Sequence, residues 1–579
     1  MKKLFLFLFF ISSVNLFAQS NIAFTDSAVS HVVSGNYNPL TYYPSTILNR
    51  PDTIFKGINA RISTDSLKSY IFKLASFYNR NTISDTVSQT HGIGATRRWI
   101  YSKFQQFSNA CQNRLLPAYL QFTFNIDSVK QHRNVVAVLP GIDTTDKSII
   151  IIEGHMDSRC ANNFDTISKA EGVEDNATGA ALVMELARVM SKYSYNNTIV
   201  FMTTTGEEQG LYGAYAFANY AKTKGIKIKA VLNNDVIGGI ICGYTSSAPS
   251  CPGYGNLDST QVRIFSLGSF NSAHKGLARF IKLEYKENLL PTATVPMLIS
   301  VMAPQDRTGR GGDHEPFNSD GFTAIRFTSA NEDGDANVTD TAYRDRQHTS
   351  GDSLGTFKKN STSLTPDSLF VNFAYLSRNT IINGNAAGML GIGPNQPDMA
   401  LTSPSPGSLR IQVTKQTQYK KYRIGLRSTT NDWDSVYTMT GTLIDTITGL
   451  AGGTYDVSVM SDDTNDIESL PSKEYTAKVT GVGEINAPQR NIELLQNKPN
   501  PFDIATYISV QVNDNVEYKN AYISITDLKG AEIKRIPIQL NKGVDEVLFD
   551  HGYHPTGIYI YTLVIDGQVV ESKRMVFAN

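Results

Sequence analysis

The sequence predicts an α/β fold with a mixed, mostly parallel sheet flanked by helices, followed by two small all-β sandwich modules. Segments typical of strands and helices alternate over about 360 residues, which favours one large α/β domain. From Gly384 onward this alternation stops, and short strands separated by turn residues follow. The chain has 579 residues, of which 41% are hydrophobic, enough for several separate cores.

The charge composition excludes one class of partner. The chain carries 53 Lys and Arg residues against 53 Asp and Glu residues, for a net charge of +0. No basic run is dense enough to follow a phosphate backbone, so we expect no nucleic acid partner.

The N-terminus predicts export. Two lysines follow Met1 and precede the apolar run 4–11, and Ala18 supplies a small residue at a cleavage point. This composition is that of a signal peptide over residues 1–18. No later segment approaches the ~20 apolar residues of a membrane span. We therefore expect a mature chain without a transmembrane segment, exported through the periplasm and then secreted or held at the cell surface.

Export permits disulfide bonds, but four cysteines cannot be the main source of stability in a chain of this length. Cys242 and Cys251 lie in one Gly/Ser/Pro-rich loop, and the sequence leaves open whether they pair. Cys111 and Cys160 can pair or remain buried thiols.

Residues 19–60 are polar and rich in Tyr, Asn and Pro without clear periodicity, so we expect an irregular arm there. The α/β domain is expected at 61–390, and Ser63 is the predicted N-cap of its first helix. The expected helices are 67–78, 95–107, 180–190 and 366–383, and the expected strands lie within 120–125, 134–139, 149–157, 198–208, 228–235 and 323–327.

Two of these strands end on side chains that bind metals or transfer protons. The β-branched run 149–152 is followed by His155 and Asp157, and the strand that starts at Thr198 is followed by Glu207 and Glu208. Between them, Asp175 stands at the mouth of an apolar helix. Polar residues at the C-terminal ends of strands are typical of a site in an open α/β sheet.

The pattern repeats further along the chain. Another expected strand ends on Asp235, and a Gly-rich loop that carries His314 precedes the strand 323–327. Imidazoles combined with carboxylates suit zinc, and the absence of a cysteine cluster argues against a structural thiolate site. A catalytic metal site is therefore favoured. Its candidates are His155, Asp157, Asp175, Glu207, Glu208, Asp235 and His314.

The order of these motifs over residues 60–385 resembles the secreted co-catalytic di-zinc aminopeptidases of the bacterial leucyl aminopeptidase type, a family that also holds carboxypeptidase-like members and glutaminyl cyclases. The resemblance implies two Zn²⁺ per chain. It makes His155 and Asp235 ligands of one zinc, Glu208 and His314 ligands of the other, Asp175 the bridge, Glu207 the general base and Asp157 the partner that orients His155.

The charges agree with two ions, because three ligand carboxylates against two Zn²⁺ leave about one positive charge, which a bridging hydroxide cancels. Glu207 takes the proton of that water. The expected function is hydrolysis of N-terminal residues from peptide substrates. Tyr244 is a candidate oxyanion donor. His348 and Asp352 resemble a late His-Thr-x-x-Asp stretch of the family, although packing of a loop explains them equally well.

The C-terminal third predicts two modules after a Gly/Pro/Asn linker at 391–397. Residues 398–481 resemble a fibronectin type III domain. Residues 487–579 resemble the C-terminal sorting domain of the type IX (Por) secretion system, on the motifs 494–502 and 557–563. This resemblance implies the type IX secretion machinery as a partner.

Two alternatives remain open. A glutaminyl cyclase resembles the same fold but keeps a single zinc and performs acyl transfer. A surface binding protein with a vestigial peptidase site is the other, although the complete set of expected ligands speaks against decay.

Overall fold

The computed structural model describes residues 19–241, 257–269, 271–307, 310–330, 346–358, 366–428, 432–480, 492–503, 505–514, 516–528, 530–550 and 555–578. The predicted signal peptide, Tyr244 and the pair Cys242 and Cys251 lie outside these residues. Cys111 and Cys160 are buried free thiols. Within the described ranges, no helix has the length and apolar character that crossing a membrane requires.

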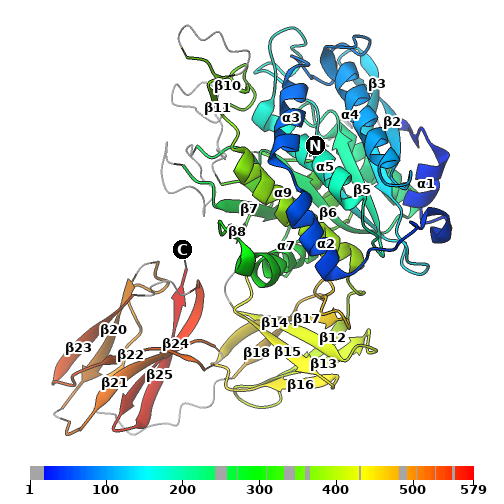
Figure 1. Ribbon diagram of the computed structural model, residues 1–579. Helices are drawn as coiled ribbons and strands as arrows, with labels where there is room; N and C mark the ends of the chain where they lie inside the picture. Colours follow the sequence, from blue (N-terminus) through cyan, green and yellow to red (C-terminus); the bar gives the residue numbers. More distant parts are fainter. Residues whose placement is uncertain are drawn as a thin grey trace, which may run out of the picture.

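A nine-stranded mixed sheet forms the centre of the N-terminal domain, in the order β1-β2-β3-β5-β4-β6-β9-β7-β8 (Figure 1). Its central strands β5, β4, β6 and β9 run parallel, which confirms the predicted fold class. The strands are β1 Ser20–Phe24, β2 Leu116–Ile126, β3 Val129–Leu139, β4 Ile149–His155, β5 Thr198–Thr204, β6 Ile228–Asn234, β7 Gln261–Ser266, β8 Leu298–Val301 and β9 Ala324–Ser329.

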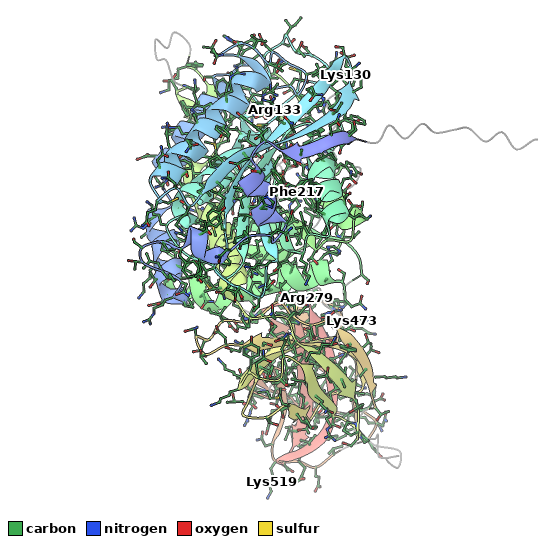
Figure 2. All side chains as sticks on the ribbon, turned by 90° about the vertical axis from the view of Figure 1, so that its right-hand side faces the viewer. Lys130, Arg133, Phe217, Arg279, Lys473 and Lys519 are labelled. Carbon is green, nitrogen blue, oxygen red and sulfur yellow. The ribbon has the colours of Figure 1, made fainter. Side chains whose placement is uncertain are left out.

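Helices cover both faces of this sheet. Because successive side chains of a strand point to opposite faces, Ile150 and Ile152 face one buried cluster while Ile149 and Ile151 face another. One cluster is covered by α2 Pro51–Arg61, α3 Thr64–Ala75, α4 Gly92–Asn109, α5 Thr178–Met190, α7 Ala273–Glu284 and α9 Phe373–Ile392. The other is covered by α1 Ser27–Val33, α6 Tyr212–Lys224 and α8 His314–Ser319; Phe217 of α6 is labelled in Figure 2.

The prediction of an irregular arm at 19–60 is wrong. β1 pairs antiparallel with β2 at one edge of the sheet, and α1, the 3₁₀ turn η1 Pro39–Tyr42 and α2 follow it. Val29, Val32 and Val33 of α1 are fully buried. Elements as short as β1 and α1 show too little periodicity to be read from sequence, and contacts with the distant β2 decide their structure.

The last helix of the domain starts and ends later than predicted. Asn372 caps α9 by accepting a hydrogen bond from the Tyr375 N–H at 2.9 Å. Gly384, where the predicted helix stops, lies inside α9, and a Cβ there would stand 2.7 Å from Leu186 Cδ2. The glycine therefore allows close packing against α5 instead of ending the helix. The predicted Ser63 cap of α3 is confirmed, since its Oγ accepts from the Ser66 N–H.

Two all-β units follow, as predicted. Each has a three-stranded and a four-stranded sheet around a core of its own. The first contains β12 Asp398–Thr402, β13 Leu409–Lys415, β14 Lys421–Arg427, β15 Ser435–Thr440, β16 Ile444–Ile447, β17 Gly453–Asp462 and β18 Tyr475–Val479. The second contains β19 Ile492–Leu494, β20 Ala505–Val512, β21 Ala521–Thr526, β22 Glu532–Pro537, β23 Gly543–Asp550, β24 Gly557–Ile565 and β25 Gln568–Phe577.

A buried ion-pair network joins the first β unit to the α/β domain. Arg279 of α7 contacts Glu474 at 2.9 Å, and Arg427 of β14 contacts the same carboxylate at 2.7 Å. Figure 2 labels Arg279 and Lys473 at this junction. Because the charges are paired and buried, removing one partner would leave an uncompensated charge.

Candidate metal centre

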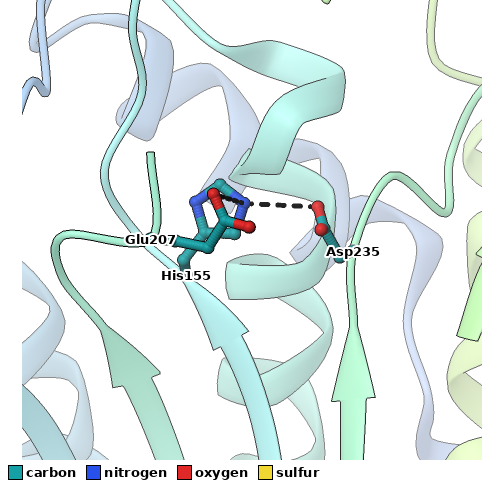
Figure 3. A group of neighbouring side chains, drawn as sticks. All are labelled: His155, Glu207 and Asp235. Atoms are coloured by element: carbon teal, nitrogen blue, oxygen red, sulfur yellow. Dashed lines mark hydrogen bonds and ion pairs between the residues drawn. The ribbon is translucent and has the colours of Figure 1, made fainter. Parts of the chain in front are cut away.

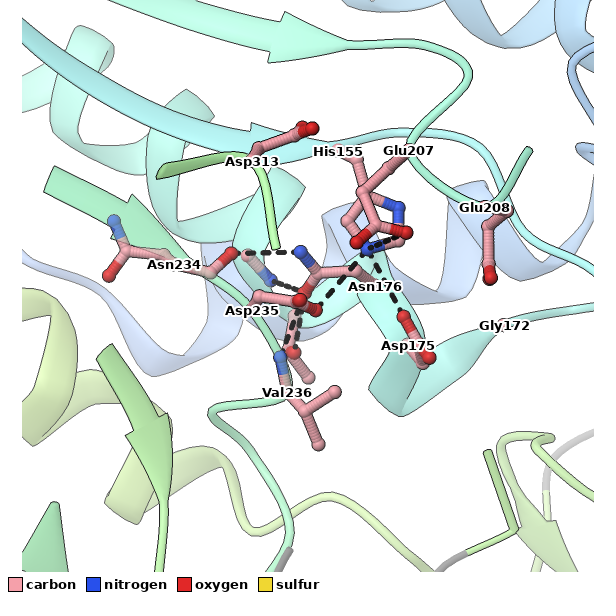
Figure 4. Close-up of polar contacts among 12 residues, drawn as sticks. His155, Gly172, Asp175, Asn176, Glu207, Glu208, Asn234, Asp235, Val236 and Asp313 are labelled. Atoms are coloured by element: carbon pink, nitrogen blue, oxygen red, sulfur yellow. Dashed lines mark hydrogen bonds and ion pairs between the residues drawn. The ribbon is translucent and has the colours of Figure 1, made fainter. Parts of the chain in front are cut away.

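The parallel strands of the sheet bring the predicted residues together at one edge. His155 is the last residue of β4, Glu207 and Glu208 follow β5, and Asp235 follows β6. The register pairs His155 with Thr204, so β4 and β5 end side by side. Asp175 reaches the same place from the short helical turn η2 Val173–Ala177 in front of α5 (Figure 4).

His155 lies at the centre of this group. Its Nε2 is 3.1 Å from Asp175 Oδ1, 3.2 Å from Asp235 Oδ1 and 4.0 Å from Glu207 Oε2. Figure 3 shows the contact with Asp235 and the position of Glu207. The ligand atoms of His155, Asp175 and Glu208 lie within 4.8 Å of one another, as do those of His155, Glu207 and Asp235. Five of the seven predicted residues therefore form one cluster.

Asp157 lies behind His155. Its backbone oxygen is 3.2 Å and its Oδ1 3.6 Å from His155 Nδ1, on the far side of the ring from the cluster. Its Oδ2 accepts hydrogen bonds from Thr82 Oγ1 at 3.0 Å and from the Glu208 N–H at 3.3 Å. Such a partner fixes the orientation of a metal-binding histidine.

The structure does not bring His314 to Glu208, so its assignment to the second metal position is wrong. His314 is fully buried, and its Nε2 lies 3.1 Å from the carbonyl oxygen of Gln305. Its nearby carboxylate, Asp306, already pairs with Arg326 at 2.9 Å and Arg307 at 3.0 Å, which disfavours a further cation there.

His348 takes the place predicted for His314. Its Nε2 is 3.0 Å from Asp175 Oδ2 and 3.4 Å from Glu208 Oε2. Asp352 of the same loop accepts hydrogen bonds from the backbone N–H groups of Glu174 at 2.8 Å and Asp175 at 3.0 Å. The loop thus delivers a histidine and also holds the turn that carries Asp175. The His-Thr-x-x-Asp spacing was the sequence signal for this role.

Excess buried negative charge dominates the electrostatics. Burial raises the pKa of Glu207 to about 8, with Asp235 and Asp175 adding to the rise against the opposing effect of His155. Burial, with Asp175, raises the pKa of Glu208 well above its ordinary value. Burial alone would lower the pKa of His155, but Glu207 and Asp235 raise it well above its usual range. Carboxylates crowded in this way favour a bound cation.

The cluster also has the atoms that a zinc ion needs. Glu208 Oε1 is buried and has no hydrogen-bond partner. Imidazole nitrogens and carboxylate oxygens without thiolates form the donor set of a catalytic zinc site. These residues therefore fit zinc.

Sequence reasoning missed an arginine beside the cluster. Arg326 of β9 is fully buried, and one of its nitrogens lies 3.0 Å from Asp235 Oδ2. The sequence did contain a signal for Arg326, namely a charged residue inside an apolar strand. An arginine at such a position is almost never fully buried unless it is paired with a carboxylate.

Comparison with known proteins gives the family. Residues 134–368 match the model of peptidase family M28. Over 396 residues the chain is 30% identical to a probable zinc metalloprotease of Leptosphaeria maculans, which covers 66% of this chain and 87% of that protein. The chain belongs to peptidase family M28. It is a zinc metallopeptidase, and all the clustered residues lie within the matched range.

Other relatives of this M28 peptidase include a probable zinc metalloprotease of Pyrenophora tritici-repentis, 33% identical over 297 residues that cover 49% of this chain and 67% of that protein. Among solved structures, the LapA aminopeptidase of Legionella pneumophila is 18% identical with a TM-score of 0.42, covering 61% of this chain and 79% of that chain. A glutaminyl cyclase of Porphyromonas gingivalis is 13% identical with a TM-score of 0.37, and the match covers 56% of this chain and 97% of that chain.

Proposed function

We propose that this M28 peptidase is a secreted two-zinc aminopeptidase that removes N-terminal residues from peptides. The observation that carries the proposal is the position of Asp175 between two histidines. Its Oδ1 is 3.1 Å from His155 and its Oδ2 is 3.0 Å from His348. A carboxylate with one imidazole at each oxygen is the arrangement of a bridge between two ions.

Two metal positions follow from these contacts. The His155 position consists of His155, Asp175 and Asp235, and the His348 position consists of Asp175, Glu208 and His348. Two zinc ions there would polarise the scissile carbonyl and activate a water molecule. Asp157 keeps the Nε2 of His155 turned toward its position through the contact at Nδ1.

Glu207 is the general base in this proposal. It stays outside both ligand sets, 4.0 Å from His155 Nε2, and 12% of its side chain is exposed. Its carboxylate is thus within reach of water and substrate while its neighbour Glu208 faces the His348 position. Glu207 accepts the proton of the attacking water and passes it to the leaving amine.

The amino direction of cleavage is proposed because the order of the motifs resembles that of the co-catalytic aminopeptidases. A single-zinc glutaminyl cyclase fits less well, because Asp175 has a histidine at each oxygen.

The C-terminal unit, 487–579, is proposed as the address for type IX secretion, and 398–481 as a fibronectin type III-like module. The two motifs that suggest the address meet in space. The Asn497 N–H donates to the Tyr561 hydroxyl at 2.9 Å, and that hydroxyl donates to the Leu495 carbonyl at 2.8 Å.

The test combines a substrate panel with metal analysis. Aminoacyl chromogenic substrates are offered with a free and with a blocked amine, and zinc per chain is measured on the same preparation. Two zinc ions and cleavage of the free-amine substrates alone are expected. Equal cleavage of blocked substrates overturns the amino direction, whereas one zinc with cyclisation of N-terminal glutamine establishes the cyclase alternative.

A further inference from the structure

Arg159 lies beside the His348 position and contacts both of its unshared residues. Its Nε donates to Glu208 Oε2 at 2.7 Å, and its Nη2 lies 2.6 Å from His348 Nδ1. A third nitrogen, Nη1, donates to the carbonyl of Cys160 at 3.3 Å. The Arg159 side chain is 17% exposed and that of Glu208 is 2% exposed. A fixed positive charge therefore stands within contact distance of this position.

The two metal positions differ in which oxygen of their unshared carboxylate an arginine contacts. At the His155 position, Arg326 contacts Asp235 Oδ2, while Oδ1 is the oxygen that faces His155 at 3.2 Å. At the His348 position, Arg159 contacts Glu208 Oε2, the same oxygen that lies 3.4 Å from His348. Arg159 thus holds an oxygen that faces the ligand set, and Arg326 does not.

The contact with His348 also competes with a cation. Arginine can only donate hydrogen bonds, so His348 Nδ1 accepts, and the proton of the neutral ring is on Nε2 beside Asp175. A neutral imidazole that binds a cation through Nε2 carries its proton on Nδ1 instead. The cation at His348 and the Arg159 contact to Nδ1 therefore exclude each other.

We propose that Arg159 is a positioning residue that makes the two metal positions unequal. It keeps Glu208 and His348 paired and competes with a cation for them, so the His348 position fills last and releases its ion first. A fixed positive charge a few ångströms from a partly buried cation repels that cation, and this repulsion opposes the support that a positioning partner gives to a metal ligand. This inference rests on the two-zinc site proposed above.

The test measures metal affinity instead of turnover. Zn²⁺ binding to the full chain is followed in metal buffers, and Co²⁺ titration is followed by its visible absorption. In the wild type we expect two separated steps. Arg159→Met should tighten the second step by about tenfold or more and leave the first unchanged, so that the steps approach each other.

Two further variants separate charge from packing. Arg159→Lys keeps the charge and should retain a weak second step, whereas Arg159→Gln keeps a donor without the charge and should behave like Arg159→Met. Arg188→Met is the matched control, because Arg188 of α5 also pairs with a fully buried carboxylate, that of Glu185, and contacts none of the proposed ligands. It should leave both zinc affinities unchanged.

The outcomes distinguish this inference from the proposed function. Equal affinities in the wild type, or a second step that Arg159→Met leaves unchanged or weakens, overturns the role of Arg159 and leaves the two-zinc site standing. If the wild type binds only one zinc, the two-zinc proposal fails. A second ion entering Arg159→Met would then still uphold the inference, and its absence would overturn both.

Discussion

His348 Nε2 lies 3.0 Å from Asp175 Oδ2, while Oδ1 of the same carboxylate faces His155 at 3.1 Å. The three residues come from a loop, a helical turn and the end of a strand. Asp175 is thus shared between two imidazoles, and in the proposed two-zinc site His348 completes the second metal position.

Replacement of His348 should remove one of two zinc ions. His348→Ala leaves Asp175 and Glu208 as the only ligands of its position, so its zinc affinity should fall by more than the ~10–100-fold loss typical of an outer partner. Metal analysis after dialysis against metal-free buffer measures this. His314→Gln is the control and should keep both ions. Loss of zinc from His314→Gln with full zinc in His348→Ala would restore the original assignment.

Glu207 and Glu208 should differ although they are adjacent. Glu207→Gln keeps the shape of the side chain but cannot accept a proton, so kcat should fall by ~10²–10⁴ with zinc content unchanged. Glu208→Gln should weaken the His348 position, and its activity should fall because an ion is lost. Zinc content and rate measured on both purified variants separate the two roles. Zinc lost from Glu207→Gln and kept in Glu208→Gln would reverse them.

Chelation should abolish hydrolysis and lower stability together. The clustered carboxylates lose their counter-charge when the ions leave, and ions that bind only the folded chain stabilise it. Dialysis against a chelator should therefore lower Tm, and added Zn²⁺ or Co²⁺ should restore both Tm and activity. Activity that persists at full chelation would contradict a metal-dependent reaction.

Deletion of residues from 487 onward should leave peptidase activity intact but keep the protein in the periplasm. That unit has its own core and contributes no residue to the metal cluster among the described residues. A longer deletion from 398 onward is the contrast, because it takes Glu474 away from the buried Arg279 and should lower Tm. Normal secretion of the protein that lacks residues 487–579 would contradict the proposed role of this unit as a secretion address.

Lys229 should make stability depend on pH in the alkaline range. Its Nζ donates to the Leu390 carbonyl at 2.8 Å and to Asn197 Oδ1 at 3.1 Å, and burial lowers its pKa from 10.5 to about 8. Between these two values the unfolded chain binds a proton that the folded chain has lost, so the free energy of unfolding increases with pH. Below pH 8 the cost of the buried charge is fully present.

Urea unfolding of the wild type and of Lys229→Met, measured on both sides of this window, isolates the effect. The wild type should gain stability relative to the variant as pH rises from about 8 to about 10.5. A difference that stays constant would show that Lys229 does not titrate there.

The sequence by itself determined six of the nine strands of the sheet and most of the metal cluster. Apolar segments predicted β4, β5 and β6, and parallel neighbours end at one edge, so His155, Glu208 and Asp235 had to lie close together. The same logic failed for residues 19–60, since β1 is fixed by its pairing with the distant β2.

Only the tertiary structure decided which histidine completes the second position. In the sequence, His314 and His348 both belong to polar segments that resemble loops, although His314 begins the short helix α8. Local sequence does not place such a segment relative to a strand that is far away in the chain. His348 is fixed by Asp352, whose two hydrogen bonds to the backbone N–H groups of Glu174 and Asp175 join its loop to the bridge. His314 is held by the Gln305 carbonyl instead. Such long-range contacts form only when the chain folds, because no periodic pattern in either loop encodes them.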